Sequence, residues 1–176
     1  MNNLPLFCVV DTNVPIAANQ RASVSYTCAL SCVTALHRIM KEGRVAIDDG
    51  GRILREYRNQ LSGSGQPGVG DGFLKWLYTF QGHADRCAWV SITPRANDPE
   101  NFMEFPDHPH LKKFDPRDRK FVAVSAAHSE RPPILQAADS KWWGWKEALR
   151  ECKIEVCFLC PEDIKKFFLR KSKNRE

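Results

Sequence analysis

Short apolar runs alternate along this chain with longer segments of helical period, and this alternation limits the possible folds more than any other feature. The apolar runs are the length of buried strands, and the segments between them are long enough to cross a sheet as helices. Strands joined by such crossovers run parallel. We therefore expect an α/β fold, a three-layer sandwich around a central, mainly parallel five-stranded sheet.

The 176 residues suit one domain, 1–176, because typical domains hold about 100 to 200 residues. The predicted strands are Phe7–Val10, Val45–Ile47, Cys87–Ile92, Ile134–Ala137 and Ile154–Leu159. The predicted helices are Ser23–Met40, Gly51–Leu61, Gly72–Phe80, Arg117–His128, Trp142–Cys152 and Pro161–Leu169. Between them lie a glycine-rich stretch, 62–72, interpreted as a mobile loop near a substrate, and an irregular insertion, 93–116.

The positive charge of the chain is concentrated at one end. Lysine and arginine number 26 against 21 acidic residues, a net charge of +5, and 165–176 alone hold six basic residues and one acid. A basic carboxyl-terminal helix and tail, 161–176, on a neutral body suits a polyanion such as nucleic acid, although a solvated terminus explains it equally well. No long apolar segment or signal-peptide pattern is present, so we expect a cytoplasmic protein without a membrane partner.

The seven cysteines argue against a disulfide framework, because their number is odd and the chain has no secretory signal. Cys28 and Cys32 are one helical turn apart, and Cys157 and Cys160 form a CxxC pair. Either pair could bind zinc or act as a redox couple. The apolar sequence around Cys157 favours a strand instead, so we expect thiols that are buried as small hydrophobic groups.

Four acidic residues follow predicted strands or open the helices beside them. Asp11 ends the first strand in "VVDTNV", and Glu56 lies in the helix after the second strand. Asp118 lies in the first turn of a helix, and Asp139 follows the fourth strand. Because the carboxyl ends of parallel strands meet at one rim of a sheet, we expect these side chains to converge.

Converging carboxylates repel one another and need cations to remain ionised together. Oxygen ligands favour Mg²⁺ or Mn²⁺, so the four acids are candidate metal ligands and catalytic residues. A structural role as helix caps is the alternative for Asp118 and Asp139. Whether Asp48, Asp49 and Asp115 contribute is left open by the sequence.

The same segments, in the same order, resemble a known family. "VVDTNV", "ILREYRNQL", "DPRDRKFVAVSAA" and "ILQAADSKWWGW" are similar to the four acidic motifs of PIN-domain nucleases, which places the family's acids on Asp11, Glu56, Asp118 and Asp139. Ala138 stands where the family usually has Thr or Ser before the last acid.

The resemblance implies a PIN-like, metal-dependent phosphodiesterase that acts on RNA, or in some relatives on DNA. It also implies a homodimer or a protein inhibitor as partners to consider. The toxin of a toxin–antitoxin pair and an effector of phage defence are two settings for such an enzyme. A DNA nuclease of the same chemistry and a PIN-like scaffold module are the competing hypotheses.

Other residues near the acids allow both a functional and a structural interpretation. The tryptophans at 142, 143 and 145 could stack on bases or fill the core. Basic residues flank the acids and could bind phosphates, although such side chains are often simply solvated: Arg52, Arg55, Arg58, Arg117, Arg119 and Lys120.

Overall fold

The computed structural model describes residues 4–173, with side chains as far as Leu169. It confirms the α/β sandwich: a five-stranded sheet, parallel at every pairing, has the order β3-β2-β1-β6-β7. The strands are β1 (Phe7–Val10), β2 (Arg44–Asp48), β3 (Cys87–Val90), β6 (Ile134–Gln136) and β7 (Val156–Phe158).

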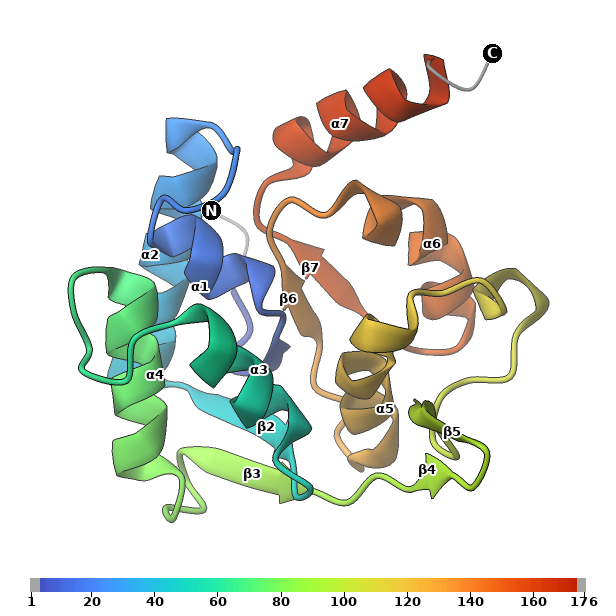
Figure 1. The fold of residues 1–176 in the computed structure, drawn as a ribbon, viewed down its shortest axis with the longest axis horizontal. Coiled ribbons are helices and arrows are strands. Elements are labelled where there is room, and N and C mark those ends of the chain that lie inside the picture. Colours follow the sequence, from blue (N-terminus) through green and yellow to red (C-terminus); the bar gives the residue numbers. More distant parts are fainter. Residues whose placement is uncertain (1–3, 174–176) are drawn as a thin grey trace.

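Helices cover both faces of this sheet (Figure 1). One layer holds α1 (Asn13–Ala18), α2 (Tyr26–Glu42) and α4 (Val69–Phe80), which contact one another. The opposite layer holds α5 (Arg119–Ala127) and α6 (Ser140–Glu151). Two more helices are α3 (Arg52–Gln60), which contacts β2 and α5, and α7 (Pro161–Lys173), which packs on α6.

The central strands are mainly apolar because helices bury them from both sides. Cys8, Val9 and Val10 of β1 are fully buried, as are Ile134 and Leu135 of the neighbouring β6. Parallel sheets in α/β proteins have this composition, which is why the apolar runs could be identified as strands from the sequence. The observed strand and helix limits differ from the predicted ones by a few residues.

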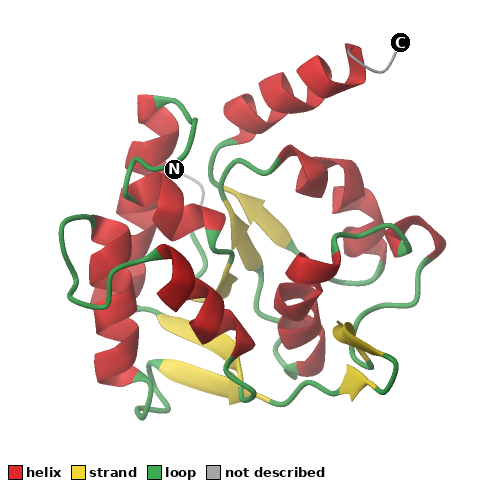
Figure 2. Ribbon diagram, viewed as in Figure 1, coloured by secondary structure: helices red, strands yellow, loops and turns green. Residues whose placement is uncertain are grey.

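The irregular insertion 93–116 contains structure that the sequence analysis missed. Figure 2 shows a small pair of strands apart from the main sheet, β4 (Pro94–Arg95) and β5 (Asp98–Phe102), which pair antiparallel. Two 3₁₀ helices follow, η1 (Pro109–Leu111) and η2 (Pro116–Asp118), the second leading directly into α5. The short helix α1 was missed as well, because six residues containing a proline carry too little helical period to be recognised.

Hydrogen bonds anchor both ends of the glycine-rich stretch 62–72. Asp71, fully buried, accepts hydrogen bonds from the backbone N–H groups of Ser62 (2.7 Å) and Gly68 (3.0 Å). The side chain of Asn19, at the end of α1, accepts another from Gly70 N (2.7 Å). At Gly70 an added Cβ would lie 2.1 Å from the carbonyl oxygen of Pro15, so only glycine fits. The stretch connects α3 to α4 and includes the first turn of α4, and its mobility near a substrate stays a prediction.

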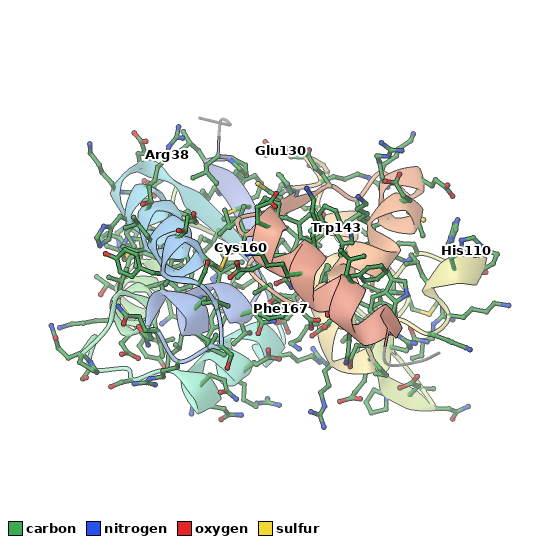
Figure 3. All side chains as sticks on the ribbon, turned by 90° about the horizontal axis from the view of Figure 1, so that it is seen from above. Arg38, His110, Glu130, Trp143, Cys160 and Phe167 are labelled. Atoms are coloured by element: carbon green, nitrogen blue, oxygen red, sulfur yellow. A yellow bond between two sulfur atoms is a disulfide. The ribbon has the colours of Figure 1, made fainter. Side chains whose placement is uncertain are left out.

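The expectation of buried, unbonded thiols is wrong for one pair, because Cys28 and Cys160 form a disulfide. They are 132 residues apart, but α2 and the turn before α7 bring them together. Figure 3 labels Cys160 at the meeting point of the amino-terminal helices and α7. The thiol of Cys32 lies 3.9 Å from the sulfur of Cys160. Cysteine number and spacing could not reveal a contact made by tertiary structure.

No helix in the part of the chain that the structure describes is long and apolar enough to cross a membrane. The basic stretch 165–176 lies partly on α7. Its side chains from Arg170 onward, and residues 174–176 altogether, lie outside the described residues, so the position of this charge is not given by the structure.

We predict that reduction of the Cys28–Cys160 disulfide lowers the stability of the fold by about 2 to 4 kcal/mol, since the bond closes a long loop and restricts the unfolded chain. Thermal unfolding with and without dithiothreitol measures this, and Cys87→Ser, in a free buried thiol, should leave the effect of reductant intact. A Cys28→Ser variant that still responds to reductant as the unaltered protein does would contradict the prediction.

Candidate active site

Asp11 follows β1, where the order in which strands are added to the sheet reverses. The chain passes from β1 to β2 on one side, whereas β6 pairs with the other side of β1. Crevices at such switch points are the usual ligand sites of open α/β sheets. The backbone N–H of Asp11 donates to the carbonyl oxygen of Leu135 (3.0 Å), and the carboxylate accepts from Asn13 N (2.9 Å), so the side chain, only 1% exposed, has a fixed position.

Glu56 reaches Asp11 because α3 is fastened over the end of β1. The buried hydroxyl of Tyr57 donates to the carbonyl oxygen of Val10, the last residue of that strand. Thr12 then donates through Oγ1 to Glu56 Oε1 at 2.6 Å. The two residues after Asp11 thus engage different carboxylates: the backbone of Asn13 holds that of Asp11, and the side chain of Thr12 holds that of Glu56.

Asp118 and Asp139 lie at the starts of α5 and α6 and approach the same rim. Asp139 is the N-cap of α6 and accepts from Lys141 N (2.9 Å) through Oδ1. Asp118 accepts from the indole N–H of Trp142 (3.2 Å) through Oδ2. The structural role considered for Asp139 is therefore real, but it engages only one of its two carboxylate oxygens.

In each of Asp11, Asp118 and Asp139, one carboxylate oxygen accepts a hydrogen bond from the described residues and the other oxygen accepts none. Among residues 4–169, no other hydrogen bond or ion pair is made to the carboxylates of Asp11, Asp118 or Asp139. Both oxygens of Glu56, in contrast, are engaged, since Oε2 lies 2.5 Å from the ammonium nitrogen of Lys120. The aspartates offer free oxygens to a ligand, whereas Glu56 does not.

Charge repulsion shows that the four acids share one environment. Burial raises the pKa of Asp11 well above its usual value, and the negative charges of Asp118, Glu56 and Asp139 raise it further, against the lowering effect of the Asn13 hydrogen bond. Burial, followed by the charges of Asp115 and Asp139, raises the pKa of Asp118 to about 7. Two lysines lie among these acids, since Lys120 pairs with Glu56 and Lys141 pairs with Asp115 close to Asp118 and Asp139. The charges of Asp11, Asp118 and Asp139 have no such partner among the described residues, so an excess of negative charge remains for a cation to neutralise.

The donor set suits a hard cation, but the oxygens do not form a compact cage. A metal cage needs at least three acidic, histidine or cysteine side chains with their ligand atoms close together. Within the described part of the chain, only one such group has its ligand atoms within 4.8 Å of one another: Cys28, Cys32 and Cys160. The disulfide engages two of those sulfurs. The four carboxylates are thus spaced more widely, as mutual repulsion and the attachment of Glu56 to Lys120 would produce. Carboxylate oxygens at this rim fit Mg²⁺ or Mn²⁺ rather than a thiolate-preferring metal.

A basic groove of about 520 Å³ opens beside Glu56 and Lys120. Helix α3 forms one wall with Arg52 and Arg55, and strand β5 forms another with Glu100 and Phe102. Arg117, in η2 just before α5, adds a further positive charge. The groove can therefore receive an anionic chain next to the acids.

The remaining acids that the sequence left open have structural roles or no contact. Asp48 is fully buried and accepts from Arg52 N (2.9 Å) and Ile53 N (2.8 Å), which fixes the start of α3. Asp115 accepts from Arg117 N (3.2 Å) and pairs with the ammonium of Lys141 (2.7 Å), and this bond holds the Asp115 pKa below its usual value. Asp49 is exposed.

The three tryptophans separate into different roles. Trp142 is fully buried and supports Asp118, which confirms the core reading for this residue. The ring of Trp145 packs against Phe114, and Trp143 lies against Phe158 with Lys146 over its ring. Figure 3 shows Trp143 close to α7 on the surface of this half of the molecule. The described contacts therefore show no tryptophan directed at the acids except Trp142.

The buried contact of Lys120 was missed by sequence reasoning, which grouped it with residues that could bind phosphate. It follows Asp118 by two positions and precedes an apolar run, and neither feature shows that its side chain turns inward. Only the packing of α5 against α3 brings it to Glu56.

Comparisons of this chain with protein-family models, with curated proteins and with solved structures find no match.

We predict that Asp118→Asn stabilises the metal-free protein at pH 8 by about 1 to 3 kcal/mol. The fold raises the pKa of Asp118 to about 7, so the protonated form is favoured in the native state. Its contribution to stability is complete below about pH 4, the unfolded pKa, and is lost as the pH rises through 7. The advantage of the variant over the unaltered protein should therefore shrink from pH 8 to pH 4.

Urea unfolding in EDTA at several pH values measures this difference. Asp49→Asn is the matched control, since it removes an exposed carboxylate near the same rim and should show no such pH trend. An equal effect of Asp118→Asn at pH 4 and pH 8 would contradict the assigned repulsion.

Proposed function

We propose that this protein is a divalent-metal-dependent endonuclease that hydrolyses phosphodiester bonds in single-stranded RNA. The observation that carries the proposal is the convergence of Asp11, Glu56, Asp118 and Asp139 at the switch point of a parallel sheet, beside a basic groove. Such a combination offers a site for a cation and a site for phosphates within one crevice. Membership of the PIN-domain family is part of the proposal and rests on the motif resemblance.

The residues divide the work between ion and substrate. Asp11, Asp118 and Asp139 would hold Mg²⁺ or Mn²⁺ through their unengaged oxygens. When bound, such an ion lowers the pKa of a water and stabilises negative charge on the scissile phosphate. Asn13, Thr12 and Trp142 keep the carboxylates oriented, which reduces the rearrangement that substrate binding requires. No covalent nucleophile is needed for this chemistry.

Nucleic acid fits the charges around the site better than a small substrate does. Arg52, Arg55 and Arg117 line an open groove rather than a closed pocket, and several phosphates spaced along a chain would use them together. The preference for RNA over DNA comes from the family resemblance. A cytoplasmic location is part of the proposal, although the Cys28–Cys160 disulfide is unusual in a reducing compartment. A second chain or a protein inhibitor is the proposed protein partner.

We predict that the purified protein cleaves labelled single-stranded RNA in Mn²⁺ or Mg²⁺ and that EDTA abolishes the cleavage. Asp11→Asn should reduce the rate at least about a hundredfold, because it removes a buried, oriented metal ligand. Single-stranded DNA and duplexes, tested in parallel, distinguish the RNA enzyme from a DNA nuclease. Asp49→Asn, in an exposed acid of the same region, should retain full activity.

Two results would contradict the proposal. Cleavage that persists in EDTA or in the Asp11→Asn variant would exclude the metal mechanism. Absence of cleavage of every substrate, together with absence of Mn²⁺ binding in calorimetry, would favour a scaffold module.

We predict that the basic groove binds RNA phosphates independently of cleavage. In EDTA, Arg55→Ala should weaken binding of single-stranded RNA and reduce the slope of log affinity against log salt by about 0.7, the change expected for one lost phosphate contact. Arg58→Ala is the matched control, because Arg58 is exposed on the same helix but does not line the groove. Equal effects of the two substitutions in a fluorescence-anisotropy titration would show that the groove is not the binding site.

A further inference from the structure

Lys120 is unusual among the lysines whose side chains the structure describes, because it is buried beside the acids. The residue is 7% exposed, and its ammonium nitrogen lies 2.5 Å from Glu56 Oε2. The same nitrogen donates to the carbonyl oxygen of Arg117 and lies 4.7 Å from the centre of the Phe121 ring. These three contacts fix the positive charge at one place in the crevice.

The contacts of Glu56 make it a poor metal ligand. Its Oε1 accepts from Thr12 at 2.6 Å, and its Oε2 is paired with Lys120. A divalent ion that bound Glu56 would have to displace the ammonium and leave it buried without an anionic partner. Breaking a buried ion pair from one side is strongly unfavourable. The three aspartates, which each keep an oxygen free, present no such obstacle.

We propose that Lys120 is a built-in cation of the acidic centre that neutralises Glu56, so that the chain binds one divalent ion, through Asp11, Asp118 and Asp139. This inference rests on the proposed metal-dependent function and deepens it. A fixed ammonium beside the carboxylates also repels a second divalent ion, because charges a few ångströms apart interact strongly in a partly buried site. Glu56 then serves as a positioning residue that holds Lys120, and Lys120 itself faces the basic groove where a phosphate would lie.

Calorimetric titration of the metal-free protein with Mn²⁺ tests the proposal without reference to activity. The unaltered protein should bind one ion per chain. Lys120→Met should bind Mn²⁺ about tenfold more tightly or accept a second ion, since it loses a repelling charge and frees Glu56. Lys75→Met, in an exposed lysine of α4 on the opposite face of the sheet, should bind as the unaltered protein does.

The double variant Lys120→Met/Glu56→Gln separates this inference from a four-ligand site. It removes one positive and one negative charge together, so Mn²⁺ affinity should return to within about threefold of the unaltered value. If Glu56 were a ligand, the double variant would instead lose a metal contact and bind at least about tenfold more weakly. Such a loss of affinity in the double variant would overturn the inference. Binding of two ions by the unaltered protein, or an unchanged Mn²⁺ affinity in Lys120→Met, would overturn it as well.

Thermal unfolding in EDTA provides a second readout, which also reports whether the variants fold. Lys120→Met and Glu56→Gln should each lower Tm by about 5 to 10 °C, and the double variant should lose clearly less than the two together. Additive losses would show that the two charges are not coupled and would count against the inference. Absence of Mn²⁺ binding by the unaltered protein would reject the proposed function, while a coupled loss in EDTA would still establish the Lys120–Glu56 pair.

Discussion

The repulsion among four carboxylates at the end of β1 is the constraint on which the rest of this site depends. Asp11 is almost completely buried, and each neighbouring acid makes its ionised form less favourable. A fold can keep such a group together only if other interactions offset the electrostatic cost. Here backbone N–H groups, an indole N–H, a threonine hydroxyl and the ammonium of Lys120 each engage one carboxylate oxygen. The arrangement destabilises the protein locally and is therefore best explained by a functional use.

The same contacts fasten α3 and α5 to each other and to the rim of the sheet. Tyr57 fastens α3 to the end of β1, and the Glu56–Lys120 pair fastens α3 to the start of α5. Strand β5 then forms the other wall of the groove. The crevice beside the acids is thus formed by segments that are distant in the sequence and are held mainly by polar bonds. Binding of a cation or of an anionic chain at this place would act on all of them.

Much of the fold could be predicted because parallel α/β sheets leave a clear pattern in the sequence. Fully buried strands are apolar runs, and the crossover helices between them are amphipathic, so the five strands were placed within a few residues. The short elements were missed for the opposite reason. Helix α1 and strand β4 hold six and two residues, too few for a period to be visible. The hydrogen bonds of Asp71 and Asn19 that anchor the ends of 62–72 were also not visible in the sequence, because they join residues from different segments.

By itself, the sequence determined the α/β class and the four acids that follow strands or open helices, because the period of a buried strand and the end of that strand are local properties of the chain. Tertiary structure decided what those acids contact. It paired Lys120 with Glu56 and engaged both carboxylate oxygens of Asp48 and of Asp115 in structural bonds. It also joined Cys28 to Cys160, which are 132 residues apart. Pairings of this kind depend on which helices pack together, and the spacing of residues within any one segment carries no record of them.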